Sequence, residues 1–174
     1  MSFNNLYDRI SRDPALGELR DGATRIFLMH PDAFMDAFRR LDLDARYTMF
    51  AAFAQSISKY SGQSVKHYRH ELSPAAQEIF LNAAVNITTD MGWGSWRFVS
   101  QTPGEVILNV TNSPFARELN SPKIGPSNFP VCAPILGLTE ALGGIIFSND
   151  PLVQEVECAA VNGGDNCQFI AQVL

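Results

Sequence analysis

The stretch LVQEVECAAVNGGDNCQFIAQVL at residues 152–174 decides the predicted fold. Asn-Gly-Gly-Asp at 162–165 separates two apolar arms, LVQEVECAAV and CQFIAQVL. Glycines flanked by Asn and Asp readily adopt the positive φ angles of a tight reversal, so the stretch predicts a β-hairpin. A two-residue turn at the glycines places Ala160 opposite Cys167.

The cysteines all lie between residue 132 and the end of the chain. Cys132 is predicted on a buried helix, and Cys158 and Cys167 lie diagonally on one face of the hairpin, within reach of a shared ion. Glu155, three residues before Cys158, adds a carboxylate. Residues three apart on an ideal strand face opposite sides, so this carboxylate joins the cysteines only if a bulge or a helical turn enters the hairpin.

Three thiols and a carboxylate form a donor set that suits Zn²⁺, and four protein ligands define a structural site. The alternative is that the thiols are inert core groups, because free cysteine is among the most buried residue types. If Glu155 does not ligate, water or another group becomes the fourth ligand and the site is open. An odd number of cysteines without a secretion signal favours reduced thiols in a cytoplasm.

The pattern E-x-x-C-A-x-x-x-G-x-x-x-C-x-F at 155–169, with Cys132 upstream, resembles the 4-vinyl reductase domain. The segments GWGSWRF at 92–98 and NSPFA at 112–116 extend this resemblance over most of the chain after about residue 20. It implies a TRAPP-like fold and an apolar, aromatic or tetrapyrrole ligand. It also implies a structural Zn²⁺ held by Cys132, Glu155, Cys158 and Cys167.

Domains of the family that the chain resembles occur as sensory inputs of aromatic-responsive transcription activators and as stand-alone proteins linked to tetrapyrrole pathways. The resemblance therefore implies a stand-alone carrier or sensor. One alternative is a 4-vinyl reductase, or its accessory, in bacteriochlorophyll biosynthesis. Hydride transfer needs a cofactor, and the sequence has neither a G-x-G-x-x-G fingerprint nor a P-loop, which argues against a reductase acting alone. A second alternative is a TRAPP-like dimeric scaffold. We expect a homodimer in each case, with Phe34 and Phe38 as candidate interface residues.

Aromatic and amphipathic side chains between the N-terminal helices and the sheet are candidates for a ligand pocket. Buried Trp and Tyr need a polar partner, which makes them useful at the wall of such a pocket. For any single aromatic residue, ordinary core packing is the simpler interpretation. The first candidate is Trp96, the second tryptophan of the GWGSW segment. The others are His67, Tyr68, Phe98, Tyr60, Trp93, Phe115 and Phe129.

Length and composition limit the class of protein. A chain of 174 residues with 46% hydrophobic and 18% charged residues is one globular domain. We divide it into an N-terminal extension over 1–20 and a ligand-binding domain over 21–174. A net charge of −5 without a basic stripe excludes nucleic acid as the main partner. A polar N-terminus and the lack of a run of about 20 apolar residues indicate a cytoplasmic protein without a membrane span.

Hydrophobic periodicity predicts an α+β domain, an antiparallel sheet with helices packed against it. Residues 115–129, rich in Pro, Asn and Ser, are predicted to form a long irregular loop that is either a lid or a packed surface crossing. Helices are predicted over 3–12, 31–41, 44–60, 73–90 and from 130 to the glycines at 143–144, and strands over 24–29, 92–100, 105–110 and the closing hairpin.

Overall fold

A computed structural model describes residues 6–66, 74–119, 127–147 and 150–173 of the chain. Its main sheet is antiparallel with the strand order β4-β5-β7-β6. The strands are β4 (Ser95–Gln101), β5 (Glu105–Thr111), β6 (Leu152–Glu157) and β7 (Asn166–Gln172).

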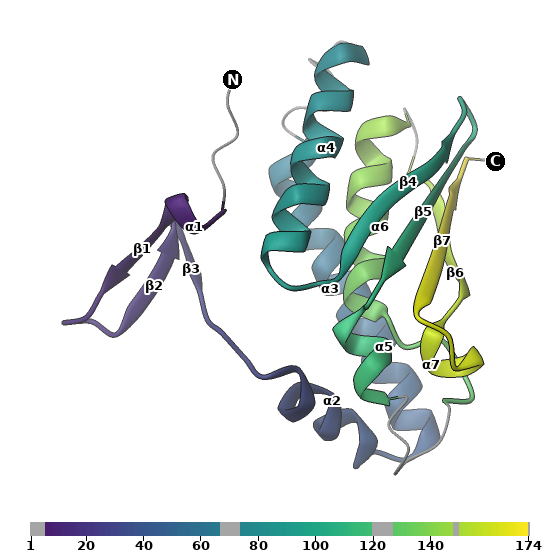
Figure 1. Ribbon diagram of the computed structural model, residues 1–174, viewed down its shortest axis with the longest axis horizontal. Coiled ribbons are helices and arrows are strands. Elements are labelled where there is room, and N and C mark those ends of the chain that lie inside the picture. The colour runs from purple at the N-terminus through teal and green to yellow at the C-terminus, as the bar shows by residue number, and fades with distance from the viewer. Residues whose placement is uncertain (1–5, 67–73, 120–126, 148–149, 174) are drawn as a thin grey trace.

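Two long helices, α4 (Pro74–Asp90) and α6 (Ala133–Ile146), pack on one face of this sheet, and a third, α3 (Leu43–Lys66), packs against α6 (Figure 1). Buried and half-buried residues alternate along β5 and β7, with Leu108 and Phe169 among the buried ones. Such alternation is expected of strands that pack one face against a core. The predicted α+β class is confirmed.

The helices α3 and α6 approach each other closely. A Cβ atom at Gly137 of α6 would lie only 2.1 Å from the carbonyl oxygen of Ala54 of α3. No side chain fits that space, so glycine at this position sets the separation of α3 and α6.

Three short helices lie at the end of the domain where α3 begins: α2 (Pro31–Arg39), α5 (Pro114–Leu119) and α7 (Ala159–Asn162) (Figure 1). The first of these packs mainly against α5. Pro31 at the first position of α2 has a φ angle suited to a helix start.

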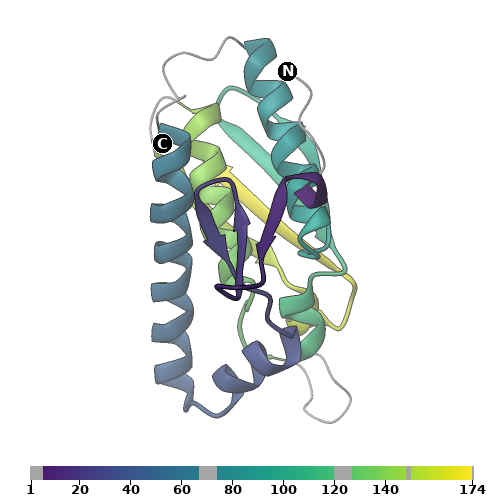
Figure 2. The same ribbon diagram turned by 90° about the vertical axis from the view of Figure 1, so that its left-hand side faces the viewer.

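An N-terminal meander stands apart from this body (Figures 1 and 2). The short helix α1 (Leu6–Arg9) leads into β1 (Ile10–Asp13), β2 (Glu18–Asp21) and β3 (Thr24–Ile26), which form a separate antiparallel sheet. Residues 27–30 then run without regular structure to α2. The Tyr7 hydroxyl donates a hydrogen bond to the Asp90 carbonyl oxygen at 2.6 Å, which links the meander to α4.

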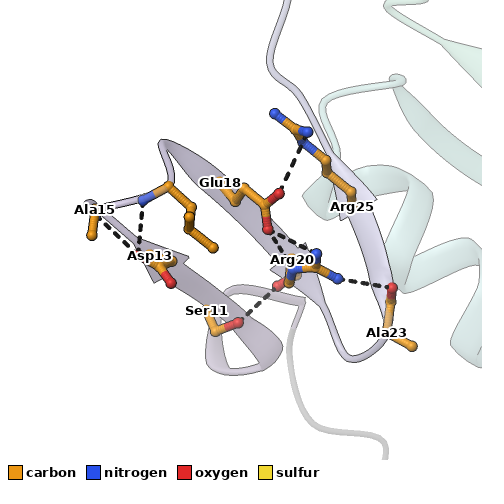
Figure 3. Close-up of polar contacts among 8 residues, drawn as sticks. Ser11, Asp13, Ala15, Glu18, Arg20, Ala23 and Arg25 are labelled. Carbon is orange, nitrogen blue, oxygen red and sulfur yellow. Dashed lines mark hydrogen bonds and ion pairs between the residues drawn. The ribbon is translucent and has the colours of Figure 1, made fainter.

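The two faces of the N-terminal sheet differ in chemistry. On one face Glu18 accepts from Arg20 at 2.8 Å and lies 3.4 Å from Arg25 (Figure 3). On the other face Leu19 pairs with Ile26, and Asp21 on the same face forms an ion pair with Arg9. None of the strand residues in this sheet is fully buried.

Several predicted element boundaries are wrong. The helix expected over 3–12 covers only 6–9 of the described residues, because the chain turns into β1 and pairs with the unpredicted strand β2. The strand expected over 24–29 is three residues long. The strand β2 spans the domain boundary expected at residue 20. The division into an N-terminal extension over 1–20 and a ligand-binding domain over 21–174 stays a prediction.

Glycines mislead the prediction at two helix ends. The helix expected to stop before 61–62 continues to Lys66, and the one expected to stop at 143–144 continues to Ile146. A glycine inside a helix costs only about 1 kcal/mol, which packing between long helices readily offsets. In addition, α5 interrupts the predicted irregular loop, of which residues 120–126 lie outside the described residues.

None of the helices in the described ranges has the length and hydropathy needed to cross a bilayer.

Candidate metal centre

Cys132 lies at the start of α6, as its N-cap residue and not inside the helix as expected. Its backbone N–H donates to Glu155 Oε2 at 3.0 Å. Its sulfur lies 3.6 Å from the sulfur of Cys167 and 3.3 Å from the hydroxyl oxygen of Ser113.

The closing hairpin is confirmed as β6 and β7, but its connection differs from the prediction. Glu155 pairs with Phe169 and Glu157 with Gln168, so Val156 is an extra residue that bulges from β6. The helical turn α7 follows, with Cys158 as its N-cap residue. A bulge therefore reverses the facing of the strand, and Glu155 and Cys158 meet although they are three residues apart.

The turn after α7 is not the predicted two-residue reversal. Gly163 takes the left-handed conformation with φ 77° as the C-cap of α7, so Ala160 is helical and does not pair with Cys167. The Ala159 N–H donates to the Cys167 sulfur at 3.4 Å. The short helix thus orients its own backbone toward the cysteine of the following strand.

Three sulfurs and one carboxylate oxygen converge as a result. The ligand atoms of Cys132, Glu155, Cys158 and Cys167 all lie within 4.8 Å of one another, and the three thiols are free and buried. The donors come from the start of α6, the end of β6, the start of α7 and the start of β7. This group of residues, which we call the metal centre, could hold a metal ion.

The carboxylate gives a test of whether the group fits a metal. Glu155 Oε2 accepts from the Cys132 N–H, but Oε1 is buried and has no hydrogen-bond partner. A buried carboxylate oxygen without a donor is costly, and a cation would supply the missing interaction. The residues present therefore fit a thiolate-binding cation.

Burial and proximity also shift the proton affinities of the metal-free group. Desolvation, together with the charge of Cys158, raises the pKa of Glu155 to about 9. Desolvation also raises the pKa of Cys132 well above its ordinary value. Hydrogen bonds from Cys132 and then Cys158 lower the pKa of Cys167 to about 5. Without a cation the group thus concentrates its negative charge on one sulfur.

A second set of residues lies next to the metal centre. Rings from α2, α3, α5 and the segments before β4 and α6 touch one another in a continuous series. We call this set the aromatic cluster: Phe34, Phe38, Tyr47, Phe50, Phe53, Trp93, Phe115 and Phe129. Ring centroids are 4.6 Å apart for the stacked pair Phe38 and Phe50, and 5.4 Å apart for Trp93 and Phe115.

Three of the predicted ligand-binding residues belong to this cluster, namely Trp93, Phe115 and Phe129. Trp96 does not: it is a core residue with 4% exposure, and its Nε1 donates to the Trp93 carbonyl oxygen at 3.1 Å. Phe98 is half-buried against the core beneath the sheet.

One further predicted ligand-binding residue in the described part of the chain, Tyr60, lies outside the cluster. Tyr60 is 68% exposed on α3, away from the ring contacts of the cluster. His67 and Tyr68 fall outside the described residues.

Phe34 and Phe38, predicted at a dimer interface, pack inside the chain. Phe38 has only 4% exposure, and Phe34 contacts the rings of Phe38, Phe53 and Phe115. Their helical spacing indicated an apolar face, but spacing alone does not tell whether that face meets the same chain or another one.

The metal centre and the aromatic cluster are joined through α5. Ser113 lies against the Cys132 sulfur and accepts from the Ala116 N–H at 3.4 Å. Phe115, two residues after Ser113 and inside α5, belongs to the cluster. Ser113 was not among the predicted site residues, although it is part of the NSPFA segment.

Known structures share this fold. Over 98% of this chain and 87% of the other, the structure resembles the phenol-responsive sensory domain of the transcription activator PoxR, solved with phenol, at a TM-score of 0.76 and 17% identity. A vinyl-4-reductase family protein from Methanocaldococcus jannaschii aligns over 85% of this chain and 98% of its own at a TM-score of 0.49 and 14% identity, too low for inference.

No protein-family model matches the sequence, and no significant match among curated proteins was found. The chain thus has the fold of the PoxR domain, and the fold implied by the sequence resemblance is confirmed. At this identity the likeness extends to the fold alone.

Proposed function

We propose that this chain is a small-molecule-binding module of the 4-vinyl reductase type, which holds a small aromatic ligand as a sensor or carrier and contains a structural Zn²⁺. The observation that carries the proposal is the fold match over 98% of the chain to a phenol-responsive sensory domain. The aromatic cluster supports it, because flat apolar rings pack well against an aromatic ligand.

Zinc is the ion that best suits the metal centre. Three sulfurs and one carboxylate oxygen match the donors and the coordination number of a structural zinc site. Such an ion would tie the start of α6 to both arms of the closing hairpin. Its function in this proposal is to stabilise the wall on which α5 and the aromatic cluster rest, and not to take part in chemistry.

A phenol titration tests the proposal. We expect phenol to quench the tryptophan fluorescence of the zinc-loaded protein, and a Trp93→Phe variant to lose most of this response because Trp93 touches Phe115. Trp96→Phe is the matched control, since Trp96 packs in the same buried core but is not one of the rings that form the aromatic cluster. No response to phenol or to other small aromatics would contradict the proposal.

A tetrapyrrole ligand, a reductase role and a TRAPP-like scaffold remain the alternatives. A coloured protein after expression in a pigment-making host would favour a tetrapyrrole carrier. NAD(P)H consumption with a divinyl substrate would favour a reductase. A stable dimer that binds neither aromatics nor pigment would favour the scaffold.

We also propose that the module is a homodimer. Phe34 and Phe38 pack inside the chain and do not support a dimer interface. The supporting observation is that Phe27 and Leu28, which follow the N-terminal sheet, are 76% and 82% exposed. Adjacent large apolar side chains at such exposure are typical of a contact surface.

A further inference from the structure

Two groups in the described part of the chain have buried side-chain polar atoms without a hydrogen-bond partner. One is Glu155 Oε1, which the metal centre explains. The other is the guanidinium of Arg39, whose Nε and Nη2 are both buried and unpaired. No part of the fold or of the metal centre accounts for this second group.

Arg39 ends α2 at the edge of its buried face. Met35, one turn earlier, is fully buried, and the preceding residue Phe38 belongs to the aromatic cluster. Residues four apart on a helix lie one above the other on the same face. The side chain of Arg39 therefore starts from the face that α2 presents to the interior, next to the rings of the cluster.

The neighbouring arginines, unlike Arg39, have acceptors within the chain. Arg40 donates from Nε and Nη2 to Asp36 Oδ2 at 2.9 and 2.7 Å. Arg46 donates to three carbonyl oxygens at the end of α2, those of Phe38, Arg39 and Leu41, at 3.1–3.2 Å. Arg40 and Arg46 are therefore paired within the chain, whereas Nε and Nη2 of Arg39 are not.

An arginine does not lose its proton in a protein, so burial cannot be relieved by neutralising the side chain. Buried charged donors are normally paired, and an unpaired one indicates a missing partner. The two unpaired nitrogens, Nε and Nη2, form the edge of the guanidinium that binds a carboxylate through two parallel hydrogen bonds.

We propose that Arg39 binds the carboxylate of a small aromatic acid whose ring packs against the aromatic cluster near Phe38. The inference rests on the proposed function and names the ligand class of that module, an arylcarboxylate. The rings provide the apolar contact, and Arg39 provides the charge and the orientation. A neutral phenol would use only the first of these.

Benzoate, its neutral analogue benzamide, and acetate are the probes, titrated into the zinc-loaded full chain by calorimetry. We expect benzoate to bind at least about tenfold more tightly than either of the others, since a hydrogen bond to a charged group exceeds a neutral one by roughly that factor. In Arg39→Gln the preference over benzamide should disappear while benzamide affinity stays the same. Arg40→Gln should keep the preference, because Arg40 is already paired with Asp36.

Stability gives an independent measurement. Without ligand, Arg39→Gln should melt no lower than the wild type, because it removes a buried unpaired charge. Benzoate should raise the melting temperature of the wild type more than that of Arg39→Gln, while benzamide should raise both equally. Nitrogen-15 NMR of the Arg39 Nε–H should shift with benzoate and not with benzamide.

The outcomes separate the two proposals. Equal affinity for benzoate and benzamide, equal affinity for benzoate and acetate, or an unchanged preference in Arg39→Gln overturns the arylcarboxylate inference. If phenol still binds in those cases, the proposed function stands. If none of the aromatic probes binds, both fall.

Discussion

At the scale of single residues, the sulfur of Cys167 belongs to a group whose parts come from four elements. A Cys167→Ser variant removes one thiolate from the metal centre, so we expect it to lose its zinc and to melt at least about 5 °C lower. In a domain of this size each kcal/mol corresponds to roughly 2–4 °C, and a structural metal contributes several. Zinc per folded chain, by elemental analysis, is the measurement.

Ser113→Ala is the matched control for that experiment. It removes a hydroxyl 3.3 Å from the Cys132 sulfur but no ligand, so it should keep one zinc per chain. Full zinc retention in Cys167→Ser, or wild-type protein purified without chelators that contains no metal, would contradict the metal centre.

Glu140, half-buried on α6, gives a pH-dependent prediction. Burial raises the pKa of its carboxyl, and a hydrogen bond from Ser58 offsets this in part. A raised pKa in the folded state means that the folded chain binds the proton more tightly than the unfolded one. The ionised group is therefore unfavourable to folding, and its cost appears as pH rises above the unfolded value of about 4.3.

Glu140→Gln should accordingly melt higher than the wild type at pH 7, with the difference shrinking toward pH 4. Glu78→Gln, at an exposed position on α4, controls for the loss of one negative charge. A stabilisation by Glu140→Gln that is the same at both pH values would exclude burial of the charge as its cause.

The resemblance of the sequence to a known family named the four residues of the candidate metal centre, but their meeting could not be derived from the sequence. On an ideal strand Glu155 and Cys158 would face opposite sides. The extra residue Val156 in the bulge brings them to the same side. A bulge depends on pairing with β7 and leaves no mark in the local pattern. Arg39 gave no signal either, because burial of a charged side chain depends on what surrounds it.

At the scale of elements, Gly137 and Gly144 of α6 form a natural pair. Gly137→Ala should lower the free energy of unfolding by about 1–3 kcal/mol, because its Cβ would meet the Ala54 carbonyl and force α3 and α6 apart. Gly144→Ala has open space and should raise stability by up to about 1 kcal/mol. Urea denaturation checks both, and equal effects of the two changes would contradict the close packing.

Helix ends were predicted less well than helix existence. The apolar spacing of 31–41 and 73–90 located α2 and α4 correctly. The ends of α3 and α6 were wrong because glycine was read as a local stop signal, whereas packing along the whole α3–α6 interface carries both helices past it.

At the scale of the whole molecule, the N-terminal meander was predicted only in its last strand, β3. Its strands are three or four residues long, too short for period-two alternation to stand out. The longer helices and the strands after residue 30 were predicted in the right order, because each is long enough for its hydrophobic pattern to show, whereas the short helices α5 and α7 were not predicted.

The same meander argues for the dimer. Small sheets need an apolar face packed against something to be stable, and the apolar residues Ile10, Leu19 and Ile26 are only half-buried. The exposed Phe27 and Leu28 continue that apolar surface along the chain. A second copy of the chain has the same surface, and in a two-fold dimer the N-terminal meander of each copy would cover that of the other.

A Phe27→Ser, Leu28→Ser double variant tests this dimer. We expect light scattering after size exclusion to give the dimer mass for the wild type and the monomer mass for the variant, because serines remove the apolar contact and leave the helices and main sheet unchanged. Tyr60→Ser is the control: Tyr60 is about as exposed but lies on α3, outside the meander, so the variant should remain dimeric. A monomeric wild type would contradict the dimer. A dimer that survives the double substitution would show that the contact lies elsewhere than at Phe27 and Leu28.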